Sequence, residues 1–150
     1  MDLLGVTTDG RLAIIELKVK PRNGARGDAP VYALMEGLRY AAVVQANMVA
    51  IRTEVKDGFG IEISDRAPIV QILAPEDWWS GWRDMHQSTR LKAGNWESCF
   101  ADLASRLEGR LGVTVECASL TDLGLTDIKW EVGQPRLPRL QFVAPVALHP

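Results

Sequence analysis

Three side chains near the start of the chain have the types and spacing of a metal-assisted hydrolytic site: Asp2, Glu16 and Lys18. Carboxylate oxygens suit Mg²⁺, which Mn²⁺ can replace, and such an ion keeps positions open for water and a substrate phosphate. A lysine beside the ion can orient or deprotonate the attacking water, or offset the charge that builds on the phosphorane. The alternative is a solvated strand face on which Glu16 and Lys18 form an ordinary ion pair.

The intervening residues predict the hairpin that brings the carboxylates together. Residues 3–6 and 12–19 are short aliphatic and β-branched runs, and residues 8–10, Thr-Asp-Gly, suit a connection whose Gly has a positive φ. A two-residue turn would set Asp2 out of register with Glu16, whereas a three-residue loop sets them opposite each other. Only the second places both carboxylates on one face, with Cβ atoms roughly 4.5–5.5 Å apart.

The alternation of side chains along a strand places Lys18 beside the two carboxylates, whose repulsion favours a cation between them. Lys18 falls on the same face as Glu16, while the odd-numbered neighbours point the other way. Two carboxylates this close repel, and each raises the pKa of the other unless a cation lies between them. A divalent ion is therefore favoured over a purely structural role.

The order of these residues resembles the PD-(D/E)XK nuclease superfamily, in which an Asp precedes an apolar strand ending in Glu-x-Lys. The resemblance implies metal-dependent hydrolysis of phosphodiester bonds in nucleic acid, with DNA the first candidate. Asp2, Glu16 and the main-chain carbonyl of Leu17 would hold the Mg²⁺. Lys18 would act on the nucleophilic water. A second function of a different class is a catalytically inactive module of the same fold that binds nucleic acid or a protein partner.

A helix is expected after the Glu-x-Lys strand, as in that superfamily. Asp28 can cap it and Pro30 can begin it, and the helix runs to about residue 47. The spacing of its apolar residues is helical. These residues are Leu34, Leu38, Ala41 and Ala42.

The middle of this helix carries a second motif. Residues 36–40, Glu-Gly-Leu-Arg-Tyr, resemble the Gln-x-x-x-Tyr element of exonuclease-like and single-strand endonuclease branches, with Glu in place of Gln. The resemblance implies that Glu36 and Tyr40 support the site. The alternative for Glu36 is an ion pair with Arg39 or Arg52.

The chain begins at the Asp strand, whereas the superfamily core ordinarily has a helix and a strand before it. Three explanations are open: a truncated sequence or misassigned start codon, a partner chain that completes the sheet, or a decayed enzyme. An Asp strand without that neighbour leaves N–H and C=O groups unpaired at a sheet edge. We therefore expect a homodimer, or a partner chain that covers this edge.

The segment after the Glu-x-Lys strand is basic. Lys20, Arg22 and Arg26 follow Lys18 with no acidic residue among them, so the loop can contact the phosphates that flank a scissile bond. An ordinary solvated loop is an equal alternative. The net charge of −2 argues against a strong nucleic-acid binder, because Lys and Arg supply most non-specific affinity.

The remaining patterns predict an α/β fold, with a mixed central β-sheet flanked by helices and the first hairpin at its centre. This is a restriction-endonuclease-like core with a C-terminal β extension. Further strands are expected at residues 48–52, 69–74, 113–118, 128–132 and 140–143, and helices from residue 76 and over residues 96–111. The cluster of Trp78, Trp79 and Trp82 favours core or subunit interface over a base-stacking platform.

Length and composition favour one domain, with a nuclease-like core at residues 1–75 and the extension at residues 76–150. The 150 residues are 47% hydrophobic, yet no segment is long and apolar enough to span a membrane or to form a signal peptide. Cys99 and Cys117 lack metal-ligand spacing and are expected to be buried, reduced thiols of a cytoplasmic protein.

Overall fold

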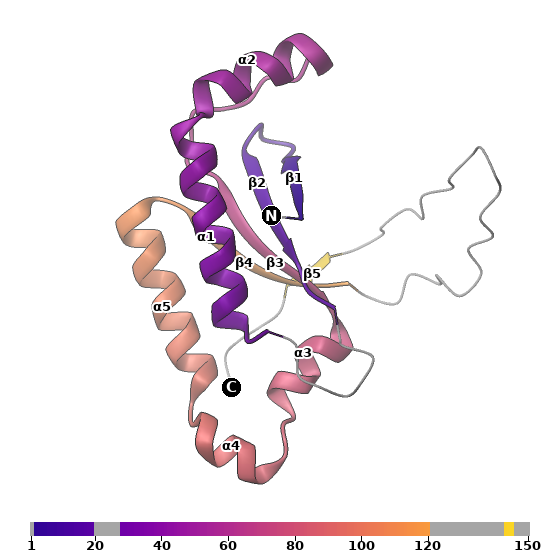
Figure 1. Ribbon diagram of the computed structural model, residues 1–150, viewed down its shortest axis with the longest axis vertical. Coiled ribbons are helices and arrows are strands. Elements are labelled where there is room, and N and C mark those ends of the chain that lie inside the picture. The colour runs from indigo at the N-terminus through magenta and orange to yellow at the C-terminus, as the bar shows by residue number, and fades with distance from the viewer. Residues whose placement is uncertain (1, 20–27, 121–142, 146–150) are drawn as a thin grey trace, which may run out of the picture.

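The structure is a computed structural model that describes residues 2–19, 28–120 and 143–145. It is an α/β structure on a mixed five-stranded sheet in the order β1-β2-β3-β4-β5 (Figure 1). The strands β2, β3 and β4 are parallel, and β1 and β5 are antiparallel to their neighbours. The strands are β1 (Leu3–Val6), β2 (Leu12–Leu17), β3 (Ile69–Pro75), β4 (Thr114–Leu120) and β5 (Val143–Pro145). The helices are α1 (Pro30–Ala46), α2 (Met48–Phe59), α3 (Glu76–Arg83), α4 (Gln87–Ala93) and α5 (Trp96–Leu111).

The first hairpin has the register that a three-residue loop predicts. The Thr7 N–H donates to the carbonyl of Arg11 at 2.8 Å, and Gly10 has a φ of 77°. The strand pairing that follows, carried one residue beyond β1, sets Asp2 opposite Glu16. The predicted connection and register are therefore confirmed.

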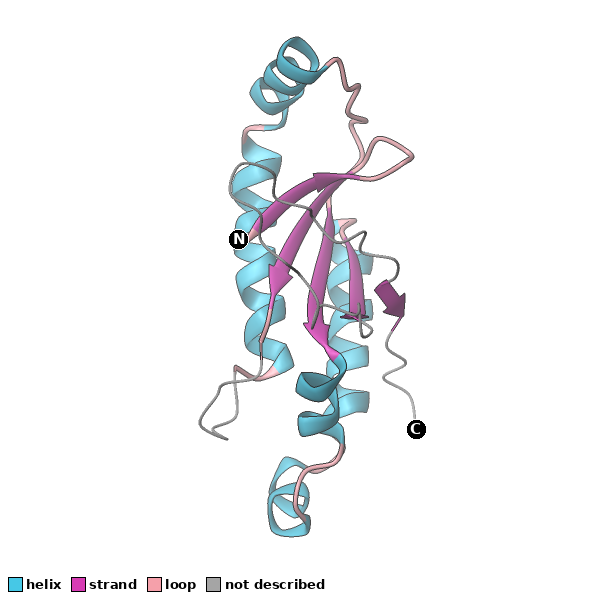
Figure 2. Cartoon of the chain, turned by 90° about the vertical axis from the view of Figure 1, so that its right-hand side faces the viewer, coloured by secondary structure: helices cyan, strands magenta, loops and turns pink. Residues whose placement is uncertain are grey.

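Both long helices lie on one face of the sheet, where the core forms. Figure 2 shows α1 and α5 side by side behind the strands. The sheet residues of the core alternate along their strands, as a face packed against helices requires. On the strands these are Leu12, Ile14, Val70, Ile72 and Ala74, and on the helices they include Ala33, Leu34, Ala41, Val44 and Phe100.

A glycine lets α1 lie close to the sheet. Gly37 is buried, and a Cβ at this position would come within 2.5 Å of Cγ1 of Val70 on β3. Such a distance is far below van der Waals contact, so only glycine fits at the present spacing. This close approach sets the height of the neighbouring residue, Glu36, above the sheet.

Two expectations about the elements are wrong. Residues 48–52 begin the helix α2 rather than a strand, because Met48, Ile51 and Val55 recur with helical spacing and contact the core from one side. The first hairpin is also not central. β1 is at the edge of the sheet and β3 is in the middle, since β3 pairs with both β2 and β4.

The expected helices are present. α1 begins with Pro30 at its first position, although the N-cap residue is Ala29 and no side chain caps the helix. Helix α3 begins at residue 76, and α5 has the expected bounds. The expected strand at residues 128–132 and the first three residues of the strand at 140–143 lie outside the described residues.

The tryptophan cluster is part of the core. Trp78 and Trp79 are buried with ring centroids 4.7 Å apart, and the Trp79 indole N–H donates to the carbonyl of Ala118 on β4. Trp82 links this pair to Trp96 of α5. The cluster thus joins α3 to the sheet and to α5.

Within the described ranges, no helix combines the length and apolarity that crossing a membrane requires.

Candidate functional site

The site is centred on Lys18, which directly follows β2. Its backbone N–H donates to the carbonyl of Leu73, so the ladder between β2 and β3 continues through this residue. The ammonium donates a hydrogen bond of 3.0 Å to Oε1 of Glu16. Glu16 is only 5% exposed and lies on the face that α1 covers. The expected placement of Glu16 and Lys18 on one face is confirmed.

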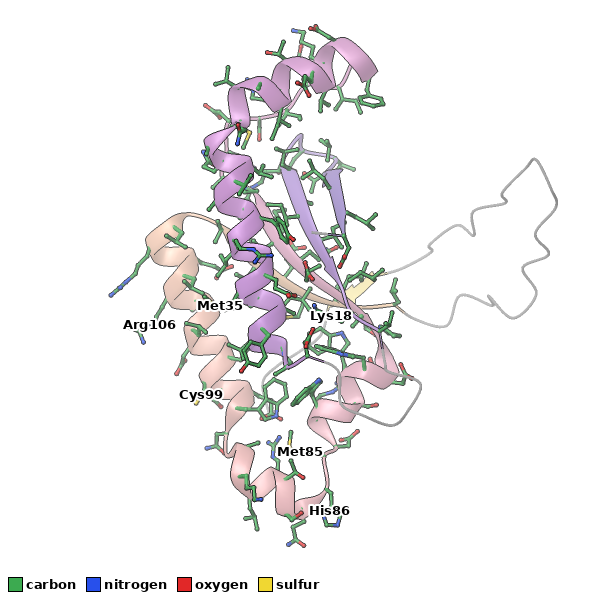
Figure 3. All side chains as sticks on the ribbon, in the orientation of Figure 1. Lys18, Met35, Met85, His86, Cys99 and Arg106 are labelled. Carbon is green, nitrogen blue, oxygen red and sulfur yellow. The ribbon has the colours of Figure 1, made fainter. Side chains whose placement is uncertain are left out.

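Helix α1 brings a second carboxylate to the same ammonium. Oε2 of Glu36 accepts a hydrogen bond of 2.6 Å from Lys18 Nζ, and Oδ2 of Asp28 lies 3.6 Å from that nitrogen. Lys18 therefore joins the end of β2 to α1 and to the residues just before that helix (Figure 3). Of the two alternatives for Glu36, the structure shows a contact with the site.

The electrostatics of this cluster favour the charged forms of Lys18 and Glu36. Burial works to lower the pKa of Lys18, but the hydrogen bonds to Glu36 and Glu16 outweigh it and raise that pKa. The hydrogen bond from Lys18, followed by one with Glu16, holds the pKa of Glu36 below its ordinary value. Lys18 is thus a fixed cation between two carboxylates.

Asp2, the residue before β1, contacts the same strand. Its Oδ2 accepts a hydrogen bond of 2.8 Å from the backbone N–H of Leu17, the residue between Glu16 and Lys18. The side chain is exposed. Asp2 is therefore tied to the main chain of the Glu-x-Lys strand, between Glu16 and Lys18.

Asp2 and Glu16 are the carboxylates of this site that could serve as metal ligands. The described residues contain no group of three or more His, Cys, Asp or Glu side chains that could hold a metal. Mg²⁺ commonly uses one or two protein carboxylates and takes its other ligands from water and phosphate. Asp2 lies opposite Glu16 when the register of β1 and β2 is continued by one residue, so the two carboxylates could supply that number of ligands.

A groove opens beside the cluster along the start of α1. Its volume is about 450 Å³. Asp28 and Glu36 belong both to the groove and to the contacts of Lys18. The remaining lining residues are Tyr32, Met35 and Arg39. A ligand in the groove would therefore contact two carboxylates that also contact Lys18.

The other predicted site residues have different placements. Tyr40 packs against the core, and its Oη accepts a hydrogen bond of 3.2 Å from Arg39 rather than from Lys18. Lys20, Arg22 and Arg26 lie outside the described residues. Asp28 is a contact of Lys18 rather than the helix cap that its position before Pro30 predicts. The sequence does not predict the contact between Asp28 and Lys18, because the residues between them do not define how far apart the two side chains lie.

In comparisons with known proteins, no family model, no curated protein and no solved structure matches the chain. The site must therefore be interpreted from its own geometry.

Proposed function

We propose that the chain is a metal-dependent nuclease of the PD-(D/E)XK type, which hydrolyses phosphodiester bonds in nucleic acid. The observation that carries the proposal is the meeting of Lys18 with Glu16 and Glu36 at the end of β2, beside Asp2. Support comes from a buried Glu and a partly buried Lys two residues apart at the end of β2, with the Asp before β1 opposite that Glu. The restriction-endonuclease-like core is part of the same proposal.

The roles of the residues follow from their contacts. Asp2 and Glu16 would hold Mg²⁺, with the main-chain carbonyl of Leu17 as a further ligand. When bound, the ion would polarise the scissile phosphate and acidify a water. The ammonium of Lys18 already donates to two carboxylates, so it acts as a fixed cation that offsets charge on the phosphorane rather than as a base. Glu36 holds that ammonium in place from α1.

The test is a cleavage series on plasmid and labelled single-stranded DNA and RNA, with Mg²⁺, Mn²⁺ or EDTA. Lys18→Ala should lower the rate by about 10²-fold or more, as loss of a positioned transition-state charge does. Its affinity for nucleic acid in Ca²⁺ should stay nearly unchanged, because the loss falls on the transition state. Lys56→Ala, which removes an exposed lysine on α2, is the matched control. Absence of metal-dependent cleavage by the unaltered chain would contradict the proposal.

The second candidate is a catalytically inactive module of the same fold that binds nucleic acid or a protein. One observation favours it: Lys18 already gives both Glu16 and Glu36 a cationic partner, so neither carboxylate depends on a metal ion for one. Titration calorimetry with Mn²⁺ separates the two candidates. Equal heats for the unaltered chain and an Asp2→Asn, Glu16→Gln double variant would favour the module.

A further inference from the structure

The groove along the first three turns of α1 combines exposed apolar side chains with charged ones. The side chain of Tyr32 is 65% exposed and that of Met35 is 53% exposed, although both sit beside a deeply packed helix face. α1 has only two charged residues, Glu36 and Arg39, and both line this groove. Exposed aromatic and thioether groups next to converging polar groups are characteristic of ligand sites.

We infer that this groove binds one unstacked base of a single-stranded nucleic acid, an inference that rests on the proposed function and specifies its substrate. A base has a flat face that stacks on an aromatic ring, and Tyr32 offers such a ring to solvent. Met35 adds a polarizable contact beside it. A base inside a duplex has both faces stacked and cannot enter.

The polar groups of the groove favour the edge of a base over a phosphate. Asp28 and Glu36 are acceptors, and carboxylates accept hydrogen bonds from amino groups such as N4 of cytosine. Two carboxylates would repel a phosphate in the same space. Arg39, one turn further along α1, is exposed and supplies the cation for the adjoining backbone.

The groove and the Lys18 cluster share two residues. Glu36 lines the groove and also accepts the 2.6 Å hydrogen bond from Lys18, and Asp28 lies 3.6 Å from the same ammonium. A base held in the groove therefore brings the neighbouring phosphodiester toward Lys18. The groove would thus select single strands at the place where the chemistry is proposed.

The test measures fluorescence anisotropy of labelled DNA oligomers in EDTA, where no metal-dependent cleavage occurs. Oligo-dC should bind more tightly than the corresponding duplex, and more tightly than oligo-dT, which lacks an exocyclic amino group. Tyr32→Ala should weaken binding of oligo-dC by about fivefold to a hundredfold, as loss of one stacking partner does. Tyr32→Phe should keep it, since the ring remains.

Phe59→Ala is the matched control, because Phe59 is an exposed aromatic residue on α2 and 77% exposed. Its affinity should equal that of the unaltered chain. Binding of duplex as tight as that of single strands, no effect of Tyr32→Ala, or equal affinity for oligo-dC and oligo-dT would overturn the inference. Tyr32-dependent binding of oligo-dC without cleavage in Mg²⁺ would refute the nuclease alone and support the base site.

Discussion

At the scale of single residues, Lys18 contacts two carboxylates that differ in their exposure to solvent. Glu16 is buried and Glu36 is partly exposed, so the ammonium joins an inner carboxylate to an outer one. Removing Lys18 would take away the cation that the buried Glu16 contacts, which is costly. The cluster is therefore expected to matter for stability as well as for chemistry.

The first prediction concerns the pH dependence of that stability. Because the folded-state pKa of Glu36 is lowered, its contribution is present above the unfolded pKa of about 4.3 and is lost as the pH falls through the folded value. Because the pKa of Lys18 is raised, its contribution is present below about 10.4 and is lost as the pH rises through the folded value. Both contributions are thus complete between about pH 5 and 9.5.

Urea unfolding across this range checks the prediction. Glu36→Gln should lower the free energy of unfolding at pH 7 by less than about 1 kcal/mol, since the side chain is partly exposed, and should flatten the decline on the acid side. The control is Glu54→Gln, which alters an exposed carboxylate on α2. Identical acid limbs for the Glu36 and Glu54 variants would show that the pair with Lys18 does not contribute.

The two cysteines give a second prediction. Cys99 is exposed, so the expectation that both thiols are buried is wrong for this residue, whereas Cys117 on β4 is half-buried. Burial raises the pKa of the Cys117 thiol to about 12. Since the thiolate is the reactive form, iodoacetamide at pH 8 should label Cys99 first and Cys117 only after unfolding. Mass spectrometry of timed samples decides it, and equal labelling rates in the folded protein would contradict the assignment.

At the scale of elements, the position of Glu36 depends on how closely α1 lies on β3. Gly37 makes that approach possible, and it is the residue next to Glu36. The helix has no capping side chain at its start, so its packing on the sheet, rather than its ends, holds it in place. A change in the helix-to-sheet distance would therefore be felt at Lys18.

The third prediction is that Gly37→Ala destabilises the chain although alanine is the better helix former. The added Cβ would meet Val70 Cγ1 at 2.5 Å, and such overpacking costs typically about 1–3 kcal/mol. α1 should move outward, and cleavage should fall with it. Gly58→Ala on α2, where an added Cβ meets nothing within 4 Å, is the control and should be neutral or stabilising. Equal unfolding free energies for both variants would contradict the close packing.

At the scale of the whole molecule, β1 is the end of the described sheet and carries no charge. Its residues are Leu-Leu-Gly-Val, and the side chain of Leu3 is 52% exposed. An apolar edge strand without lysine, proline or a bulge is open to pairing with another strand. We therefore keep the expectation that a second copy of the chain, or a partner, covers this edge.

The fourth prediction tests that expectation in solution. Sedimentation should show association that increases with protein concentration, and Leu3→Lys should weaken it, because a lysine on an edge strand opposes pairing. Val49→Lys makes the same change at an exposed position of α2 and should leave the association intact. A monodisperse monomer at high concentration, with slow hydrogen exchange in β1, would contradict the expectation that another chain pairs with β1.

The sequence by itself determined the local features of this chain. Thr8, Asp9 and Gly10 predict a tight hairpin, and the three-residue form of its loop predicts Asp2 opposite Glu16, the register that the structure has. The helical spacing from Trp96 and the Pro at the start of α1 likewise depend on neighbouring residues only. The sequence predicts such features because backbone preferences and the periodic spacing of apolar side chains depend on only a few neighbouring residues.

Only the tertiary structure decided the rest. The run beginning at Met48 is short and apolar. It forms a helix because Met48, Ile51 and Val55, which follow α1 with helical spacing, pack against the core. The partners of Lys18 on α1, the place of β1 at the edge and the groove beside Tyr32 all depend on how α1 packs against the sheet. These contacts join residues that are distant along the chain, so no local pattern contains them.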